Sequence, residues 1–358
     1  MKVGILGGGQ LGRMLALAGY PLGMTFRFYD PGEAQAVQGL GEHIRAPWQD
    51  AAALERFSRD LDVATYEFEN VPVECARAVA ERVPLRPGLE PLATGQDRIL
   101  EKSLFRSLAI PTPEFVQIDD RSSLDAAIGA LGLPAVLKTR RDGYDGKGQH
   151  MLVTMDDVDL AWADLGGRPL ILEERIDFDR ELSMIAVRSE AGHEAHYPVA
   201  ENTHRNGILQ TSIAPAADVD GVYLKQIYSY AQALMRRMKY VGVLGLELFE
   251  RSGQVLANEF APRVHNSGHW TQDGARTSQF ENQLRAVCGL PLGGTEAHTP
   301  ILMTNLIGQL PETVELLSGP GTRVHLYGKS PRPGRKLGHV NTQRVIGQPP
   351  LREPRGGV

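Results

Sequence analysis

The stretch GVLGLELFERSGQVLANEFAPRVHNSGHWT, residues 242–271, carries the most specific information in the chain. Glu247 lies in one apolar run and Glu259 in the next, and the turn sequence ERSGQ joins the two runs. In an antiparallel hairpin these glutamates would be cross-strand neighbours, but they face the same side only with an odd-length loop or a bulge. Two buried carboxylates repel each other unless a cation lies between them. The alternative is that each glutamate ends its strand in solvent, although apolar residues surround both.

Hard oxygen ligands favour Mg²⁺, which also bridges substrate phosphates, so Glu247 and Glu259 are the predicted metal ligands. The absence of a nearby cysteine argues against a His/Cys zinc site. Just past the second ligand, a cluster of donors indicates an anion site: Arg263, His265, Asn266, Ser267 and His269. Taken alone, His265 is more typical of a structural histidine than of a catalyst.

The segment AVLKTRRDGYDGKGQ, residues 135–149, places Lys138 at the end of an apolar strand and follows it with three loop glycines. Mobile glycines let backbone N–H groups close over phosphate oxygens, while the lysine supplies a positive charge held by the strand below it. The segment lacks the G-K-[ST] of a Walker loop. It predicts a phosphate-binding loop, and the alternative is a solvated hairpin.

The segment PLILEERIDFDRELS, residues 169–183, is an apolar strand that runs into paired glutamates. A strand that leaves its sheet at residues 174–176 exposes backbone donors and acceptors that could bind the edge of an adenine ring. Glu181, at the start of the next strand, could then accept hydrogen bonds from ribose hydroxyls. The alternative is a solvated strand end.

The amino-terminal segment GILGGGQLGRMLALA, residues 4–18, holds a G-x-G-x-x-G pattern between a buried strand at 2–6 and a helix. Asp30 follows near the end of a second strand, close to the spacing at which an acid takes ribose hydroxyls. This pattern is typical of a nicotinamide or flavin oxidoreductase. A helix N-terminus binds other phosphates as well, so the pattern alone leaves the ligand open.

Strand and helix signals alternate through the first ninety residues, which predicts an open parallel sheet with helices on both faces. A proline- and glycine-rich stretch at 84–97 follows, and we place the first domain boundary near Leu92. From there to about residue 298 an α+β region is expected. After Pro300 come short strands and a basic stretch, KSPRPGRKLGH, which predict a small β-rich module.

With 42% hydrophobic and 23% charged residues, the 358-residue chain has the composition of a soluble multidomain enzyme. No apolar run is long enough to span a bilayer and no cleavable leader is visible, so we expect a cytoplasmic protein. A net charge of −5 gives no general attraction to nucleic acid. Cys75 and Cys288 are far apart and are expected to be buried free thiols.

The ordered set Arg98, Lys138, DGYDGKGQ, EERI with Glu181, Glu247 and NEFAPRVHNSGHWT resembles the ATP-grasp superfamily. Within it, GGGQLGRM, TYEFENV and RPGRKLGHVN are similar to the bacterial purine-biosynthesis enzymes that carboxylate 5-aminoimidazole ribonucleotide. The resemblance implies an ATP-grasp fold with a Rossmann-like domain at 1–92, an ATP-grasp domain with a mobile lid at 93–298 and a β-rich module at 299–358. It also implies that ATP phosphorylates bicarbonate, and that the ribonucleotide amine captures the resulting carboxyphosphate or its CO₂.

The resemblance further implies roles for residues. Bicarbonate and its phosphorylated form would meet Arg263, His265 and Asn266, with Tyr144 above them on a lid formed by residues 143–148. The expected ATP-binding residues are Arg98, Lys138, Gly143, Tyr144, Asp145, Gly146, Lys147, Gly148, Gln149, Glu173, Glu174, Arg175, Ile176, Glu181, His204, Asn258 and Glu259. Those expected to bind the ribonucleotide are Gly9, Gln10, Leu11, Glu69, Ser267, Lys329, Arg335 and Lys336, with Glu69 ahead of Glu67 in orienting the amine.

By the same resemblance the glycine loop faces the ribonucleotide, Asp30 is left without a role, and the expected cofactors are ATP and two Mg²⁺ ions. The expected partners are small molecules, with a second copy of the chain forming a homodimer. Three alternatives stay open: another ATP-grasp ligase such as a formate-dependent ribonucleotide transformylase, an NAD-dependent oxidoreductase, and a noncatalytic nucleotide sensor. A dehydrogenase would have no need of the glutamate pair or the lysine loop.

Overall fold

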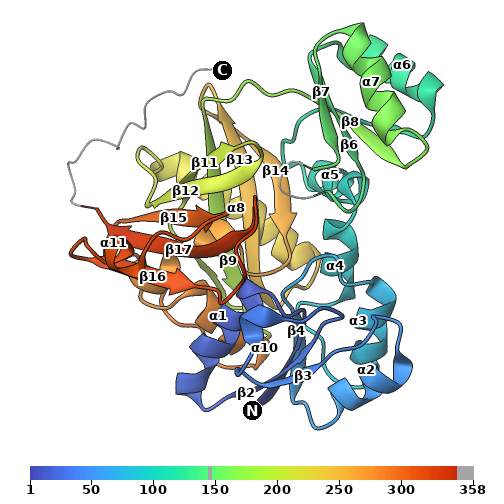
Figure 1. The fold of residues 1–358 in the computed structure, drawn as a ribbon. Coiled ribbons are helices and arrows are strands. Elements are labelled where there is room, and N and C mark those ends of the chain that lie inside the picture. Colours follow the sequence, from blue (N-terminus) through green and yellow to red (C-terminus); the bar gives the residue numbers. More distant parts are fainter. Residues whose placement is uncertain (144–146, 345–358) are drawn as a thin grey trace.

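The computed structural model describes residues 1–143 and 147–344, which form three sheets (Figure 1). The amino-terminal sheet is parallel throughout, with the order β3-β2-β1-β4. Its strands are β1 (Lys2–Leu6), β2 (Thr25–Tyr29), β3 (Glu42–Ile44) and β4 (Val63–Tyr66). The helices that accompany it are α1 (Gln10–Gly19), η1 (Tyr20–Leu22), η2 (Gln35–Val37), α2 (Ala51–Ser58) and α3 (Val73–Ala80). The predicted parallel sheet is confirmed.

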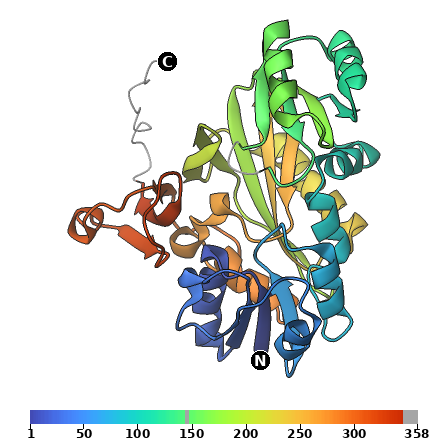
Figure 2. The same cartoon turned by 45° about the vertical axis from the view of Figure 1, so that its right-hand side comes forward.

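A second, antiparallel sheet of four strands stands apart at the far end of the molecule (Figure 2). Its order is β5-β8-β6-β7, from β5 (Phe115–Ile118), β6 (Ala135–Thr139), β7 (Gln149–Leu152) and β8 (Leu170–Glu174). Helices α6 (Arg121–Leu131) and α7 (Met155–Leu165) pack against it, and each begins with a capping box, on Asp120 and on Thr154. This small sheet carries Lys138.

The third and central sheet is antiparallel and has nine strands, with the order β14-β13-β9-β11-β12-β15-β17-β16 and β10 beside β9. Its first six strands are β9 (Arg180–Arg188), β10 (Glu194–His196), β11 (Ala200–Arg205), β12 (Ile208–Ala214), β13 (Gly242–Arg251) and β14 (Gln254–Ala261). The last three are β15 (Ile301–Ile307), β16 (Thr322–Leu326) and β17 (Lys336–Gln343). The carboxy-terminal strands therefore extend the central sheet through the β12–β15 pairing.

Helices connect and cover these sheets. Helix α8 (Gly221–Arg237) packs on β9 and β13, and α10 (Gln279–Val287) packs on α1 and β13. The separator at 84–97 contains a short helix, α4 (Leu89–Gly95), and leads into α5 (Arg98–Ser107), which joins the small sheet to the rest (Figure 1). The remaining elements are η3 (Asn266–Gly268), α9 (Thr271–Gly274) and α11 (Thr313–Leu316). Both cysteines are free thiols as expected, but only Cys75 is buried and Cys288 is partly exposed. Across the described residues, no helix combines the length and apolar character needed to cross a bilayer.

Candidate active site

Glu247 and Glu259 face each other across the β13–β14 hairpin. The strand register shifts after Glu247, so that Leu248 pairs with Ala257 and Asn258 is the extra residue of a bulge. The bulge that the two glutamates need in order to point to the same face of the hairpin is therefore present. Both glutamates lie inside their strands, so neither is at a strand end. The side chain of Glu247 is 17% exposed, whereas that of Glu259 is 41% exposed and open to solvent on one side.

Burial raises the pKa of Glu247, and the neighbouring charge of Glu259 raises it further. The pKa of Glu259 lies below its ordinary value: burial opposes ionisation, but the cations of Arg98 and Lys138 outweigh it. Arg98 Nη1 is 3.2 Å from Glu259 Oε2. An ionised carboxylate opposite a carboxyl that resists ionisation forms a pair that a divalent cation would stabilise.

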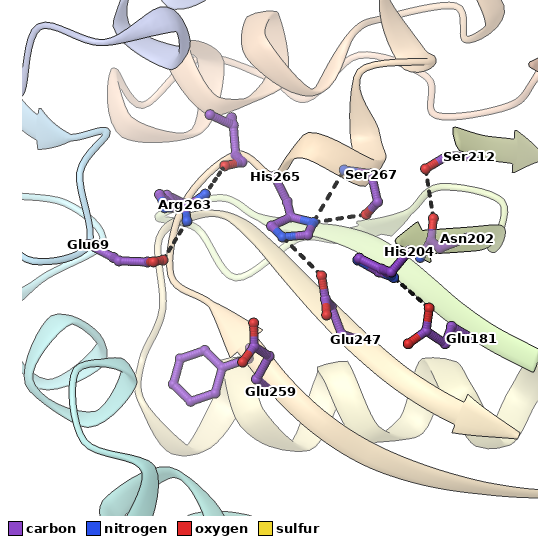
Figure 3. Close-up of polar contacts among 12 residues, drawn as sticks. Glu69, Glu181, Asn202, His204, Ser212, Glu247, Glu259, Arg263, His265 and Ser267 are labelled. Atoms are coloured by element: carbon purple, nitrogen blue, oxygen red, sulfur yellow. Dashed lines mark hydrogen bonds and ion pairs between the residues drawn. The ribbon is translucent and has the colours of Figure 1, made fainter. Parts of the chain in front are cut away.

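His265 contacts this pair through Glu247 (Figure 3). The backbone N–H of Ser267 donates to His265 Nδ1 at 3.3 Å, which leaves the ring proton on Nε2. Nε2 lies 3.2 Å from Glu247 Oε1. Burial lowers the pKa of His265 well below its ordinary value, and the Arg263 charge lowers it further. The imidazole is thus neutral and lies in contact with Glu247.

Arg263 and Asn266 border the same region. Arg263 Nη2 donates to Glu69 Oε2 at 2.5 Å, which ties the site to the segment after β4 (Figure 3). The amide nitrogen and oxygen of Asn266 are buried and find no partner among residues 1–143 and 147–344. Ser267 is buried, and its hydroxyl lies 2.9 Å from His265 Nδ1. His269 is buried with its ring against His339, and Gln279 links it to the backbone of His265.

Carboxylates occupy the glycine loop of the amino-terminal domain. Gly8 N donates to Asp30 Oδ2 at 2.9 Å, and Gly9 N donates to Glu67 Oε1 at 2.6 Å. In a dinucleotide-binding fold these amides would face a pyrophosphate. Burial raises the pKa of Glu67, against the opposing effect of the Gly9 amide. Two carboxylates at this position disfavour a dinucleotide and bring Glu67, not Glu69, to the glycine loop.

The basic carboxy-terminal loop meets that glycine loop. Lys329 Nζ donates to Gln10 Oε1 at 2.5 Å, and burial followed by the charge of Arg335 lowers the pKa of Lys329 to about 8. Arg335 donates to Ser330 O at 3.1 Å. The charge of Lys336 acts on both Glu247 and His265. The structure thus brings together residues that lie at opposite ends of the sequence, and their binding of the ribonucleotide stays a prediction.

Lys138 lies within β6, and its Nζ is 3.0 Å from Glu173 Oε2. Glu181 Oε2 accepts from His204 Nδ1 at 2.5 Å (Figure 3). The strand exit after Glu174 is present, since β8 ends there. Glu174 and Arg175 form ion pairs with Arg251 and Asp177, and Ile176 is buried.

In the predicted phosphate loop, Gly148 has φ +69°, and a Cβ there would come within 2.8 Å of Thr139 Oγ1. Only glycine fits this position without strain. Gly143, Lys147 and Gln149 flank the loop. Tyr144, Asp145 and Gly146, which the resemblance also assigns to ATP binding, lie outside the described residues.

Two buried residues of α5 are missing from the predicted site. Glu101 Oε1 accepts from Phe260 N at 2.6 Å, and Lys102 Nζ donates to Asn258 O at 2.9 Å. The residues that they contact flank Glu259 in sequence. The signal that could have identified them is their spacing of three and four residues from Arg98, which puts all three on one helix face.

Within the described ranges, no cluster of three or more His, Cys, Asp or Glu side chains could hold a metal ion. A site with two carboxylates fits Mg²⁺, because that ion keeps several waters and takes further ligands from substrate phosphates. It does not fit a structural zinc ion, which requires four protein ligands.

Three protein families match consecutive parts of the chain. The ribonucleotide synthetase preATP-grasp domain matches residues 1–96, the ATP-grasp domain residues 103–280, and the phosphoribosylaminoimidazole carboxylase C-terminal domain residues 302–344.

Whole-chain relatives agree with these matches. N5-carboxyaminoimidazole ribonucleotide synthase of Pseudomonas aeruginosa is 48% identical, over 95% of this chain and 94% of its own. The Brucella melitensis protein of the same name is 45% identical, over 94% and 95%. The crystal structure of N5-carboxyaminoimidazole ribonucleotide synthetase from Thermus thermophilus superposes with a TM-score of 0.92 at 50% identity, covering 96% and 93%. The Aspergillus clavatus synthase in complex with ADP and 5-aminoimidazole ribonucleotide superposes with a TM-score of 0.89 at 30% identity, again covering 96% and 93%.

Proposed function

The chain belongs to the N5-carboxyaminoimidazole ribonucleotide synthase family of ATP-grasp ligases, and from this premise we propose how its own residues carry out the reaction. The enzyme carboxylates 5-aminoimidazole ribonucleotide at the expense of ATP, a step of purine biosynthesis. The oxidoreductase, sensor and transformylase alternatives have no support in these relatives. The observation that carries the assignment of roles is the opposed pair Glu247 and Glu259, with Arg98 on one carboxylate and His265 on the other.

ATP occupies the region between the small and central sheets. Lys138 and Arg98 supply positive charge for its phosphates, and the residue 143–149 loop closes over them. The backbone after Glu174 offers donors and acceptors to adenine, with Ile176 as an apolar wall, and Glu181, held by His204, accepts from the ribose. Exclusion of water by the loop protects a labile acyl phosphate.

Glu247 and Glu259 are the proposed ligands of Mg²⁺, and a second ion on the same pair is part of the proposal. When bound, Mg²⁺ neutralises phosphate charge during phosphoryl transfer. His265 keeps Glu247 oriented, and Arg98 does the same for Glu259. These contacts leave the second oxygen of each carboxylate for a ligand.

Bicarbonate is the proposed acid. Its oxygen attacks the γ-phosphorus of ATP, which gives carboxyphosphate and releases ADP. The exocyclic amine of the ribonucleotide then forms the new C–N bond at the carboxyl carbon, or at CO₂ released from it, and inorganic phosphate leaves. Arg263, His265 and Asn266 line the site for this carboxyl group, and Asn266 offers both unpartnered polar atoms to it. The resemblance assigns Tyr144 to the same carboxyl group, and this role stays part of the proposal.

The ribonucleotide lies between the glycine loop and the basic loop. Lys329, Arg335 and Lys336 carry the charge for its phosphate, because the amides of Gly8 and Gly9 are already bonded to carboxylates. Gly9, Gln10, Leu11 and Ser267 line the pocket. Glu69 acts through Arg263, while Glu67 faces the ribonucleotide directly.

The domain limits 1–92, 93–298 and 299–358, a homodimeric assembly and a cytoplasmic location complete the proposal. Sedimentation velocity of the full chain tests the assembly, and a single species with the mass of one chain would contradict it.

ADP release by the purified protein, with each candidate acid and amine in turn, tests the reaction. We expect ADP release that requires 5-aminoimidazole ribonucleotide and increases with bicarbonate, together with formation of the carboxylated amine. ADP release that requires formate and another ribonucleotide amine would overturn the bicarbonate assignment.

A further inference from the structure

Side chains of helix α5 contact strand β14 at Glu259 and at the residues before and after it. Arg98 binds the carboxylate of Glu259 itself, Glu101 accepts from the N–H of the next residue, and Lys102 donates to the carbonyl of Asn258 before it. Asn258 is the bulge residue, whose carbonyl would otherwise lack a ladder partner. The bulge therefore fixes the position of the Lys102 ammonium.

Lys102 reaches the small sheet from this fixed position. Its Nζ is 3.4 Å from Glu173 Oε2, the same oxygen that accepts from Lys138 Nζ at 3.0 Å. The Lys102 side chain is fully buried and that of Glu173 is 3% exposed, so solvent does not screen the contact. One ammonium thus links a strand of the central sheet to a strand of the small sheet.

The three side chains form a group with two cations and one anion. If Lys138 were the only partner of Glu173, the pair would be neutral and would attract phosphate weakly. With Lys102 sharing Glu173, the group keeps one net positive charge at the position of Lys138. The other oxygen of Glu173 has no hydrogen-bond partner among the described residues. The charge of Arg98 also acts on Glu173, but Arg98 is itself paired with Glu259 at 3.2 Å.

We propose that Lys102 is a positioning residue for ATP. Its ammonium is held by the bulge carbonyl and neutralises part of the negative charge of Glu173, which leaves the ammonium of Lys138 available to the phosphates. This proposal rests on the role given to Lys138 above and deepens it. Lys102 itself touches no substrate. A purely structural ion pair would contribute to folding but would not make the effect of Lys102 on ATP depend on the charge of Glu173.

A double-mutant cycle separates these roles. ATP binding is measured by equilibrium titration with Mg²⁺ and without ribonucleotide, for the wild type, Lys102→Met, Glu173→Gln and the double variant. We expect Lys102→Met to weaken ATP binding about tenfold when Glu173 is present, but less than about threefold in the Glu173→Gln background. Lys225→Met, an exposed lysine of α8, is the matched control and should leave the dissociation constant unchanged.

Equal effects of Lys102→Met in both backgrounds would overturn the proposal, even if each variant were less stable. Thermal unfolding of every variant identifies those that fail to fold. If Lys102→Met does not fold, Lys102→Gln replaces it, since an amide can still donate to the Asn258 carbonyl but carries no charge. The cycle measures ATP binding alone, so it tests the role of Lys102 even if the wild type does not carboxylate the ribonucleotide. A failure to carboxylate would contradict only the proposed function.

Discussion

Glu247 and Glu259 stand directly opposite each other because β14 holds one extra residue, Asn258, immediately before Glu259. In an antiparallel pair of strands, directly opposed residues point to the same face of the sheet. The bulge therefore places the two carboxylates next to each other on one face. Arg98 Nη1 lies 3.2 Å from Glu259 Oε2. His265 Nε2 lies 3.2 Å from Glu247 Oε1 (Figure 3). The hairpin therefore places a carboxylate that is paired with Arg98 opposite a carboxyl group whose pKa is raised.

Glu259→Gln should lower kcat by at least about 100-fold, as expected for loss of an electrostatic contact to a transferred phosphoryl group. The amide has nearly the same volume, so the thermal unfolding midpoint should change little. Steady-state ADP release at saturating ATP measures the effect, and Glu247→Gln should behave in the same way. Full activity of either variant at ordinary Mg²⁺ concentration would remove the metal assignment.

Lys138→Met should weaken ATP binding and slow phosphoryl transfer, because the buried ammonium beside Glu173 is lost. Direct titration with ATP and single-turnover ADP formation give the two quantities separately. An unchanged ATP dissociation constant would place Lys138 outside the nucleotide site.

NADH should not bind, because Asp30 and Glu67 accept from the amides that a pyrophosphate would need. Fluorescence titration measures this directly. Saturable binding in the micromolar range would restore the oxidoreductase interpretation of the glycine loop.

Much of the fold is predictable because it depends on local patterns. The apolar run of β1, the glycine turn and the first helix predict a parallel sheet, and the runs around Glu247 and Glu259 predict a hairpin that needs a bulge or an odd loop. The continuation of the central sheet into β15 is not predictable, since the β12–β15 pairing joins residues 211–214 to residues 301–304. Neither composition nor periodicity specifies a pairing between strands so far apart in the chain.

The candidate site, too, is predictable from the sequence only in part. Residue types and spacing predict that Glu247 and Glu259 are neighbours across a hairpin, and the meeting of Lys329 with Gln10 follows from the resemblance. The neutral state of His265 and the sharing of Glu173 depend on burial and on contacts between distant segments, which the sequence does not display. Glu67 and Glu69 are two residues apart in sequence, and only the structure separates their partners.

Acidification should destabilise the fold through the buried histidines His269 and His339. Burial lowers the pKa of both well below the ordinary value, so they stay neutral when folded and take up protons when unfolded. Their contribution to stability is complete above about pH 6.5 and is lost as the pH falls below it, by up to about 1.4 kcal/mol per pH unit for each group. Denaturant unfolding between pH 7.5 and 5.5 measures the slope.

His339→Phe supplies the control for this pH dependence. Phenylalanine keeps a ring between His269 and His325 but does not titrate, although it loses the contact with the Tyr327 hydroxyl. The variant should be less stable at pH 7.5 and should show a shallower decline toward pH 5.5. An unchanged slope would assign the acid sensitivity to other groups.

The last prediction concerns the coupling of ATP use to carboxylation. Asn266 presents two buried polar atoms without partners among the described residues, next to Arg263 and His265. If these atoms hold the carboxyl group of carboxyphosphate, Asn266→Ala should impair transfer to the amine more than it impairs ATP binding, because their ligand is complete only after the first chemical step. The intermediate would then decompose in water, and some ATP would be consumed without product.

The ratio of ADP released to carboxylated ribonucleotide formed, at saturating bicarbonate, measures this loss. We expect the ratio to rise in Asn266→Ala while ATP affinity stays within about threefold of the wild type. His265→Ala is the informative companion, because its Nε2 lies 3.2 Å from Glu247 Oε1. Loss of that contact should increase the Mg²⁺ concentration needed for half-maximal activity, an effect not expected of Asn266→Ala. If the Asn266→Ala variant instead loses both rates in parallel at an unchanged ratio, the side chain supports the loop without touching the intermediate, and the carboxyl site must be sought at Arg263 alone.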